Sequence, residues 1–190
     1  MNAIEKALSE VTIVPEYSNS KWEMIDDQTA EIEVMETLYA LVRCTKPTNI
    51  LETGTYHGFS SIYMGQALMD NELGGSIDTI EVSKDIASET EARVKRAGLD
   101  NIHVWTSSSL EWPLPTNKRY QFASFDSDAF SRGKEFIRFK DLIDVNSIVC
   151  FHDSFFDDLT KEVREFEANG LLKVIRVGIG ARGVYVCQKT

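Results

Sequence analysis

Two glycines and an acid at the end of a predicted strand form the first candidate site. In ILETGTYHG, residues 50–58, Glu52 is followed by Gly54 and then by Gly58. Glycine permits a positive φ and a close approach of the backbone, so this spacing favours a tight turn and a helix that starts near the sheet. A dinucleotide-binding turn needs a glycine in place of Tyr56, and a P-loop needs a lysine after Gly58. The loop is therefore predicted to hold a ligand without phosphates.

The next two loops predict a nucleoside. Glu81 ends the second predicted strand, where a carboxylate can accept hydrogen bonds from both hydroxyls of a ribose. Ser107–Ser109 follow the third strand and offer hydroxyl groups suited to the edge of a purine. The alternatives are that Glu81 only precedes a helix N-terminus and that the serines form an ordinary polar loop.

Acids also end the fourth and fifth predicted strands, at Asp126 with Asp128 and at Asp153. Neighbouring carboxylates repel each other unless a cation or a proton lies between them. A divalent ion would reconcile the acids and lower the pKa of an acceptor hydroxyl. His152, with an ordinary pKa of about 6.5, is the alternative as a general base. The structural alternatives are helix caps for the acids and a hydrogen-bonded buried role for His152.

Alternating strands and helices must position these residues. After a helix at Gln28–Val42 that stops at Lys46 and Pro47, the predicted strands are Asn49–Thr53, Ile77–Val82, Ile102–Thr106, Gln121–Asp126 and Ser147–His152, with helices Phe59–Met69, Lys84–Ala97 and Arg132–Ile143 between them. Helices between strands imply right-handed parallel crossovers.

The C-terminal part of the chain departs from this alternation. After helix Leu159–Ala168, five residues join strand Leu171–Val177 to strand Gly183–Gln188, which is too short for a crossover and predicts an antiparallel hairpin. The fold class is α/β: a doubly wound, Rossmann-like sheet of about seven strands, mostly parallel, with an antiparallel C-terminal hairpin.

Length and composition bound the class of protein. The 190 residues predict one domain, 1–190, made of an N-terminal helical or lid segment, 1–45, and a cofactor-binding core, 46–190. In the first segment, Tyr17 and Trp22 belong either to a lid or to the packing of the domain. The net charge of −10, spread along the chain, disfavours nucleic acid as a partner. Three scattered cysteines and the lack of a signal segment or a membrane-length apolar run predict a cytoplasmic protein without a membrane partner.

The five strand-end segments together resemble the motifs of class I S-adenosylmethionine-dependent methyltransferases, and most closely those of the small-molecule O-methyltransferases of the catechol, caffeoyl-CoA and macrolide-sugar type. In order, the segments are ILETGTYHG, DTIEVSKD, VWTSSSLE, FASFDSDAF and IVCFHDS. The resemblance implies methyl transfer from S-adenosylmethionine to a hydroxyl of a small molecule. A homo-oligomer is a further expectation from the resemblance.

The resemblance also implies the site residues. For the cofactor they are Glu52, Gly54, Thr55, Gly58, Ser60, Glu81, Val82, Ser108, Ser109 and Asp126, with Glu81 at the ribose and the serines at the adenine. The catalytic candidates are His152, Asp126 and Asp153. Magnesium is the candidate metal, with Asp126 and Asp153 as ligands and Asp128 as a weaker third, although Ser154 replaces the asparagine that often completes such a site.

Two other functions stay open at this stage. A nicotinamide-dependent oxidoreductase would use the same type of sheet, and a protein could keep the cofactor site without catalysis.

Overall fold

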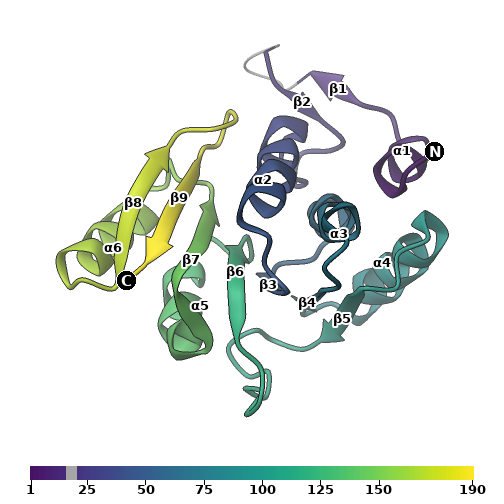
Figure 1. The fold of residues 1–190 in the computed structure, drawn as a ribbon. Coiled ribbons are helices and arrows are strands. Elements are labelled where there is room, and N and C mark those ends of the chain that lie inside the picture. Colours follow the sequence, from purple (N-terminus) through teal and green to yellow (C-terminus); the bar gives the residue numbers. More distant parts are fainter. Residues whose placement is uncertain (16–20) are drawn as a thin grey trace.

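The computed structural model describes residues 1–15 and 21–190. In this part of the chain, seven strands form one sheet in the order β5-β4-β3-β6-β7-β9-β8 (Figure 1). Their bounds are β3 (Asn49–Thr53), β4 (Ser76–Glu81), β5 (Ile102–Thr106), β6 (Tyr120–Phe125), β7 (Ile143–His152), β8 (Leu172–Val177) and β9 (Val184–Lys189). The strands from β5 to β7 pair in parallel, and β9 runs antiparallel between β7 and β8. The predicted fold class is confirmed.

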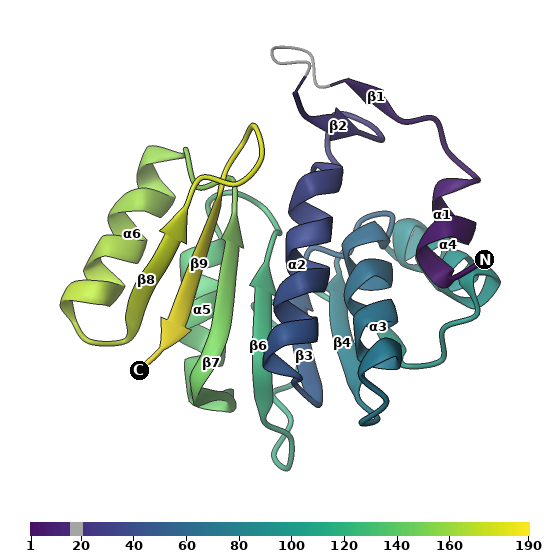
Figure 2. The same cartoon turned by 45° about the horizontal axis from the view of Figure 1, so that its top comes forward.

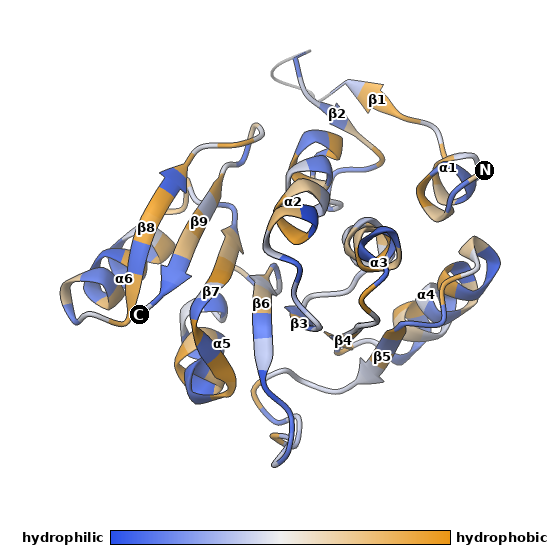
Figure 3. Ribbon diagram, in the orientation of Figure 1, coloured by the Kyte–Doolittle hydropathy of each residue, from blue (hydrophilic) through white to orange (hydrophobic). Residues whose placement is uncertain are grey.

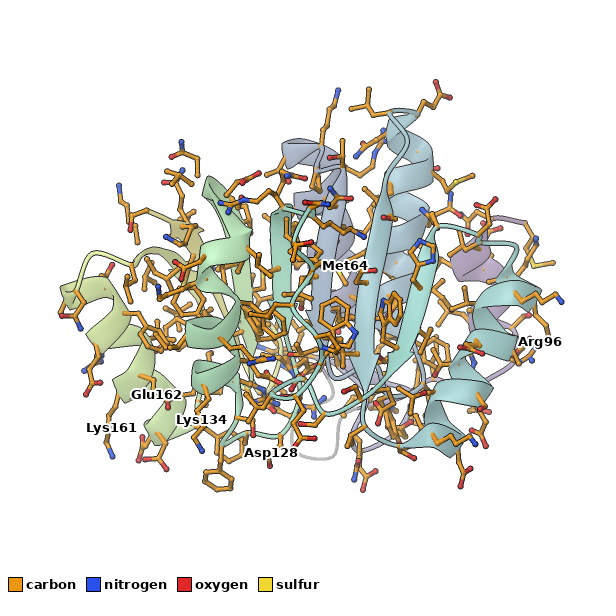
Figure 4. All side chains as sticks on the ribbon, turned by 90° about the horizontal axis from the view of Figure 1, so that it is seen from below. Met64, Arg96, Asp128, Lys134, Lys161 and Glu162 are labelled. Carbon is orange, nitrogen blue, oxygen red and sulfur yellow. The ribbon has the colours of Figure 1, made fainter. Side chains whose placement is uncertain are left out.

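Helices cover both faces of the sheet. Helices α2 (Ile32–Thr45), α3 (Phe59–Asn71) and α4 (Lys84–Ala97) pack on one face, and α5 (Arg132–Phe139) and α6 (Asp157–Ala168) pack on the other (Figures 1 and 2). Each helix carries both hydrophobic and hydrophilic residues, as helices with one buried face do (Figure 3). In Figure 4, Met64 of α3 lies in the interior, whereas Arg96 lies at the outer surface of α4. The sheet is therefore covered on both sides, which leaves its strand ends to form a site.

Local signals explain where α4 and α2 begin. Ser83 accepts a hydrogen bond from the backbone N–H of Ile86, and the helix ends at Gly98 with φ 85°, so the predicted bounds of α4 are confirmed. Helix α2 begins four residues later than predicted. The reason is that the Asp26 carboxylate accepts hydrogen bonds from the backbone N–H groups of residues 28 and 29, which holds this segment in a turn.

The boundary between α5 and β7 also differs from the prediction. The helix ends at Phe139, a 3-10 turn follows at Lys140–Leu142, and β7 already begins at Ile143. Ile143 is buried and pairs with Tyr120 across a local irregularity in the β6–β7 pairing. The predicted helix was too long because its apolar pattern continues into the buried start of this strand.

The N-terminal segment packs on the α3–α4 side of the domain. Helix α1 (Ala3–Leu8) buries Ala3 and Ala7, and the backbone N–H of Ala3 donates to Gln66 Oε1 at 2.8 Å. Two short strands, β1 (Val14–Pro15) and β2 (Glu23–Met24), pair beyond the end of the sheet at which β6 and β7 finish (Figure 2). Trp22 is half-buried, and Tyr17 lies outside the described residues. No helix in the described ranges is long and apolar enough to cross a membrane.

Candidate functional site

A cavity of about 560 Å³ lies at the carboxyl ends of the parallel strands. Every loop that follows β3, β4, β5, β6 or β7 contributes to its wall, together with residues 27 and 28 before α2 and Arg182 in the β8–β9 hairpin. The strand order reverses between β3 and β6, and this is the position at which open α/β sheets bind ligands. The cavity is therefore the candidate active site.

Gly54 forms the turn at the centre of the cavity. Its φ is +80°, and a Cβ atom at this position would lie 2.2 Å from the carbonyl oxygen of Asp126. The ends of β3 and β6 approach so closely because Asp126 N donates to Thr53 O at 2.9 Å. No residue other than glycine fits this turn without moving the backbone of the Asp126 loop.

Glu81 faces the cavity from the end of β4. Its Oε2 accepts a hydrogen bond from Tyr56 N, and its Oε1 accepts one from Ser83 N, both at 2.9 Å. These bonds fix the carboxylate, and each oxygen keeps a lone pair for a ligand hydroxyl. Val82 lines the wall beside it and is exposed. Both residues thus line the cavity, and their contact with a cofactor stays a prediction.

The serine loop, Ser107–Ser109, lines the cavity as predicted, but the Ser109 hydroxyl bonds to a buried carboxylate below the cavity. Ser108 and Ser109 both contribute to the wall, and Ser109 Oγ donates to Glu135. Glu135 on α5 is fully buried and also accepts hydrogen bonds from Thr53 Oγ1 at 2.8 Å and from Ser127 Oγ at 2.7 Å. This carboxylate therefore ties the end of β3 to the loops that follow β5 and β6 under the cavity floor.

A smaller recess of about 40 Å³ adjoins the cavity and is lined in part by Gly54, Thr55, Gly58 and Ser60. Glu52 lies beneath this loop, where Ser60 Oγ donates to it at 2.6 Å and Ser61 Oγ also donates to it. Burial raises the pKa of Glu52. Glu52 thus holds the start of α3, and its predicted contact with a cofactor stays a prediction.

His152 lies between two acids. Its Nδ1 is 2.9 Å from Asp126 Oδ1, and its Nε2 is 2.9 Å from Glu31 Oε2. Burial alone would lower the pKa of His152, but the charges and hydrogen bonds of the neighbouring carboxylates outweigh it and raise the pKa to about 9. Both ring nitrogens are therefore protonated and engaged at neutral pH. A role as general base would require breaking one of these hydrogen bonds.

Arg132 supplies the cation that the two predicted acids need. Its Nη2 donates to Asp153 Oδ2 at 2.7 Å and also contacts Asp126 Oδ1 at 3.2 Å. Arg182 N donates to Glu31 Oε1 at 2.8 Å, and Arg182 Nε lies 3.7 Å from Asp153 Oδ1. Together with His152, these residues form a group of six that we call the charge cluster. Its carboxylates are Glu31, Asp126 and Asp153, and its cations are Arg132, His152 and Arg182. Positive and negative charges balance within it.

The metal prediction can be tested against this arrangement. Asp126, His152 and Asp153 each offer a ligand atom, and these atoms lie within 4.8 Å of one another. The spacing suits an ion, but the guanidinium of Arg132 already donates to both carboxylates. A magnesium ion at the same oxygens would adjoin that cation, so the residues as arranged do not fit it.

Asp128, the third predicted ligand, is directed to its own loop. Its Oδ2 accepts hydrogen bonds from Phe130 N at 3.2 Å and from Ser131 Oγ at 3.1 Å, next to the start of α5. Figure 4 shows Asp128 at the edge of the molecule, in agreement with its exposure. The structural alternative given for this acid, a helix cap, is not observed either: the N-cap residue of α5 is Ser131, and the Asp128 contacts lie before the first helical residue.

The charge cluster predicts a loss of stability in alkaline solution. The pKa of His152 rises from 6.5 to about 9 on folding, so its contribution is complete below pH 6.5 and is lost as the pH rises through 9. The free energy of unfolding should fall by roughly 3 kcal/mol over this interval. Urea denaturation at the two pH values measures it, and equal stabilities would contradict the assignment.

Sequence reasoning missed four residues of the site, and only two of them leave a local signal. Arg132 and Glu135 share one face of α5 with buried Phe136 and Phe139, so charged residues on an apolar face could have indicated buried partners. A cation in the first turn of a helix also opposes the helix dipole and implies acids nearby. Glu31 and Arg182 lie 151 positions apart, and no local pattern connects them.

Comparisons with known proteins agree with this geometry. Residues 51–154 match a family model described as a methyltransferase domain. No curated protein sequence gives a significant match.

Several solved structures share the fold. The O-methyltransferase TomG from Streptomyces achromogenes has 18% sequence identity and a TM-score of 0.73, covering 100% of this chain and 96% of its own. An O-methyltransferase from Bacillus cereus has 18% identity and a TM-score of 0.76, covering 99% and 90%. The methyltransferase PaMTH1 from Podospora anserina has 14% identity and a TM-score of 0.76, covering 97% and 92%.

The family model begins in β3 and ends just after β7, so it spans more than half of the chain and includes the loops that build most of the cavity. The chain therefore belongs to the methyltransferase domain family.

Proposed function

We propose that this protein transfers a methyl group from S-adenosylmethionine to a hydroxyl of a small molecule. The observation that carries the proposal is the cavity at the reversal of the strand order, in which Glu81, the Gly54 turn and the serine loop converge. The TomG structure holds S-adenosylmethionine, and the Bacillus cereus and Podospora anserina structures hold S-adenosylhomocysteine, which supports the same cofactor here.

The residues of the cavity fit this cofactor. Glu81 has free lone pairs for the ribose hydroxyls, and Ser108 with Val82 lines the wall for the adenine. Gly54 leaves open the space that a side chain would fill, and the adjoining recess with Thr55, Gly58 and Ser60 would receive the methionine end. When bound, the cofactor supplies an electrophilic methyl group.

The residues of the chain orient the acceptor and take its proton. Asp153 lines the cavity, where Arg132 Nη2 donates to its Oδ2 at 2.7 Å. The Asp153 carboxylate would take the proton of the acceptor hydroxyl as that oxygen is methylated. Arg132 and His152 hold the two acids in place. Correct positioning supplies most of the rate in such a displacement.

Isothermal titration of the purified protein tests the proposal. S-adenosylmethionine and S-adenosylhomocysteine should bind with micromolar affinity, and NAD should not bind. Binding of NAD alone would instead favour the oxidoreductase, and cofactor binding without turnover on any hydroxylated compound would favour a non-catalytic protein. A screen of phenols and sugars with radiolabelled cofactor would then define the acceptor.

Glu81→Gln is expected to weaken the binding of S-adenosylhomocysteine by about 1.5–3 kcal/mol, because an amide cannot replace the charged acceptor of the ribose hydrogen bonds. The same titration measures the loss. Glu89→Gln on the exposed surface of α4 is the matched control and should bind as the wild type does. Unchanged affinity in Glu81→Gln would remove the ribose assignment.

The remaining expectations about the cellular setting are part of the proposal. The acidic net charge and the dispersed cysteines favour a cytoplasmic enzyme that does not bind nucleic acid. A homo-oligomer is proposed only from the resemblance to small-molecule O-methyltransferases.

A further inference from the structure

The acids that would bind a metal in this type of site are joined by an arginine. We propose that Arg132 takes the place of a divalent metal ion and that methyl transfer in this protein is metal-independent. The inference rests on the proposed function, because it concerns the same cavity. It replaces the prediction that Asp126 and Asp153 bind a metal ion. It also assigns a positioning role to Arg132, which lies outside the five motif segments.

The guanidinium is built into the strand ends and is not a mobile surface group. Arg132 is 3% exposed. Its Nη1 donates to His152 O at 3.0 Å, and its Nη2 donates to Ser127 O at 2.8 Å, so it joins the ends of β7 and β6 through their backbones. The same Nη2 contacts both carboxylates. The planar guanidinium thus meets four acceptors, and none of these contacts would survive a large movement.

The charge cluster has three positive and three negative groups, so its charges already balance without a metal ion. Asp126 Oδ1 is shared by Arg132 and His152, and Asp153 Oδ2 is held by Arg132. Because a guanidinium stays protonated at all working pH values, its charge is permanent. A divalent ion would add two positive charges to a balanced and largely buried group of six, and it would repel the adjacent guanidinium.

The arrangement also has a consequence for Asp153. Arg132 fixes Oδ2, while Oδ1 is buried and lies 3.6 Å from His152 Nδ1 and 3.7 Å from Arg182 Nε, so cations of the cluster hold both oxygens of this cavity-lining carboxylate. Arg132 therefore does by hydrogen bonding what an ion would do by coordination, which is to bring two acids together and to set their orientation. It does not itself contact the acceptor, so its role is positioning.

Removal of this cation should create the metal site that the wild type lacks. The experiment is a titration of the purified full chain with MnCl₂ and with MgCl₂, with and without S-adenosylhomocysteine, combined with thermal unfolding. The wild type should bind neither ion at millimolar concentration, and its melting temperature should not change with either. Arg132→Leu should gain Mn²⁺ binding by at least about tenfold, because a positive charge next to the carboxylates is gone, and its melting temperature should rise when Mn²⁺ is added.

Three further variants keep the test decisive. Arg138→Leu, on the same helix but bonded to Trp112 O and not to the acids, should behave as the wild type does toward metal. Arg132→Lys keeps the charge and should still not bind Mn²⁺, whereas Arg132→Gln removes the charge, keeps a hydrogen-bond donor and should gain Mn²⁺ binding, which decides the case if Arg132→Leu does not fold.

Micromolar binding of either ion by the wild type would overturn the inference, and so would a folded Arg132→Leu without any gain in Mn²⁺ binding. Neither result affects the binding of S-adenosylhomocysteine, whose absence in the wild type would instead overturn the proposed function.

Discussion

Gly54→Val is expected to abolish the binding of S-adenosylmethionine and S-adenosylhomocysteine. A Cβ atom at this position would lie 2.2 Å from Asp126 O, 2.5 Å from Asp126 C and 2.7 Å from Ser127 Cα, and all three are backbone atoms that cannot rotate away. The positive φ of +80° costs a further 1–2 kcal/mol or so for a residue with a side chain. Either the β3 turn or the Asp126 loop must move, and both line the cavity.

The measurement is isothermal titration at concentrations that saturate the wild type, with circular dichroism to show that the sheet persists. Gly74→Val is the matched control. Gly74 also has a positive φ, of +68°, but no atom lies within 4 Å of its would-be Cβ, so it carries the backbone strain without the overlap. If Gly54→Val binds the cofactor normally, the assignment of this turn to the cofactor is wrong.

His152→Leu is expected to lower the free energy of unfolding by about 3–5 kcal/mol, because it leaves two acids without the cation that they share. Glu31 is fully buried, and its Oε2 is 2.9 Å from His152 Nε2. Burial alone would raise the pKa of Glu31, but the hydrogen bond and charge of His152 and the Arg182 N–H lower it to about 2. Leucine has a similar volume, so the loss would arise from charge and not from a cavity.

Thermal unfolding should show a drop of roughly 6–20 °C for a chain of this size. His103→Leu on the exposed edge strand β5 is the control and should change stability by less than about 0.5 kcal/mol. The double variant His152→Leu with Glu31→Leu should recover part of the loss, since the unpaired charge on Glu31 is removed together with its partner. An unchanged melting temperature in His152→Leu would show that the cluster contributes no net stability.

The alternation of strands and helices was readable from the sequence, because hydrophobic periodicity, caps and turn residues act over a few positions. The bounds of β3, α4 and β5 were predicted as the structure has them. The five-residue connection before β9 could only be a hairpin, so the reversed strand followed as well. Most other bounds differ by one or two residues. The two largest differences, at α2 and at β7, depend on a side-chain turn at Asp26 and on pairing with Tyr120, neither of which the apolar pattern contains.

The residues that face the cavity were also largely readable, because the carboxyl ends of parallel strands converge wherever such a sheet forms. Gly54, Glu81, Ser108, Asp126 and Asp153 all line it. The electrostatic repulsion between the carboxylates of Asp126 and Asp153 was also predictable from the sequence, since these residues lie at the ends of adjacent strands.

Only the tertiary structure decided which cation neutralises these two carboxylates. Charge pairing depends on distance in space, and the partners of His152 and Asp153 come from before α2, from the start of α5 and from the β8–β9 hairpin. Glu31 and Arg182 are brought together from 151 positions apart where the start of α2 meets the β8–β9 hairpin. A sequence shows that two acids need a cation, but the folded chain determines whether that cation is an ion or an arginine.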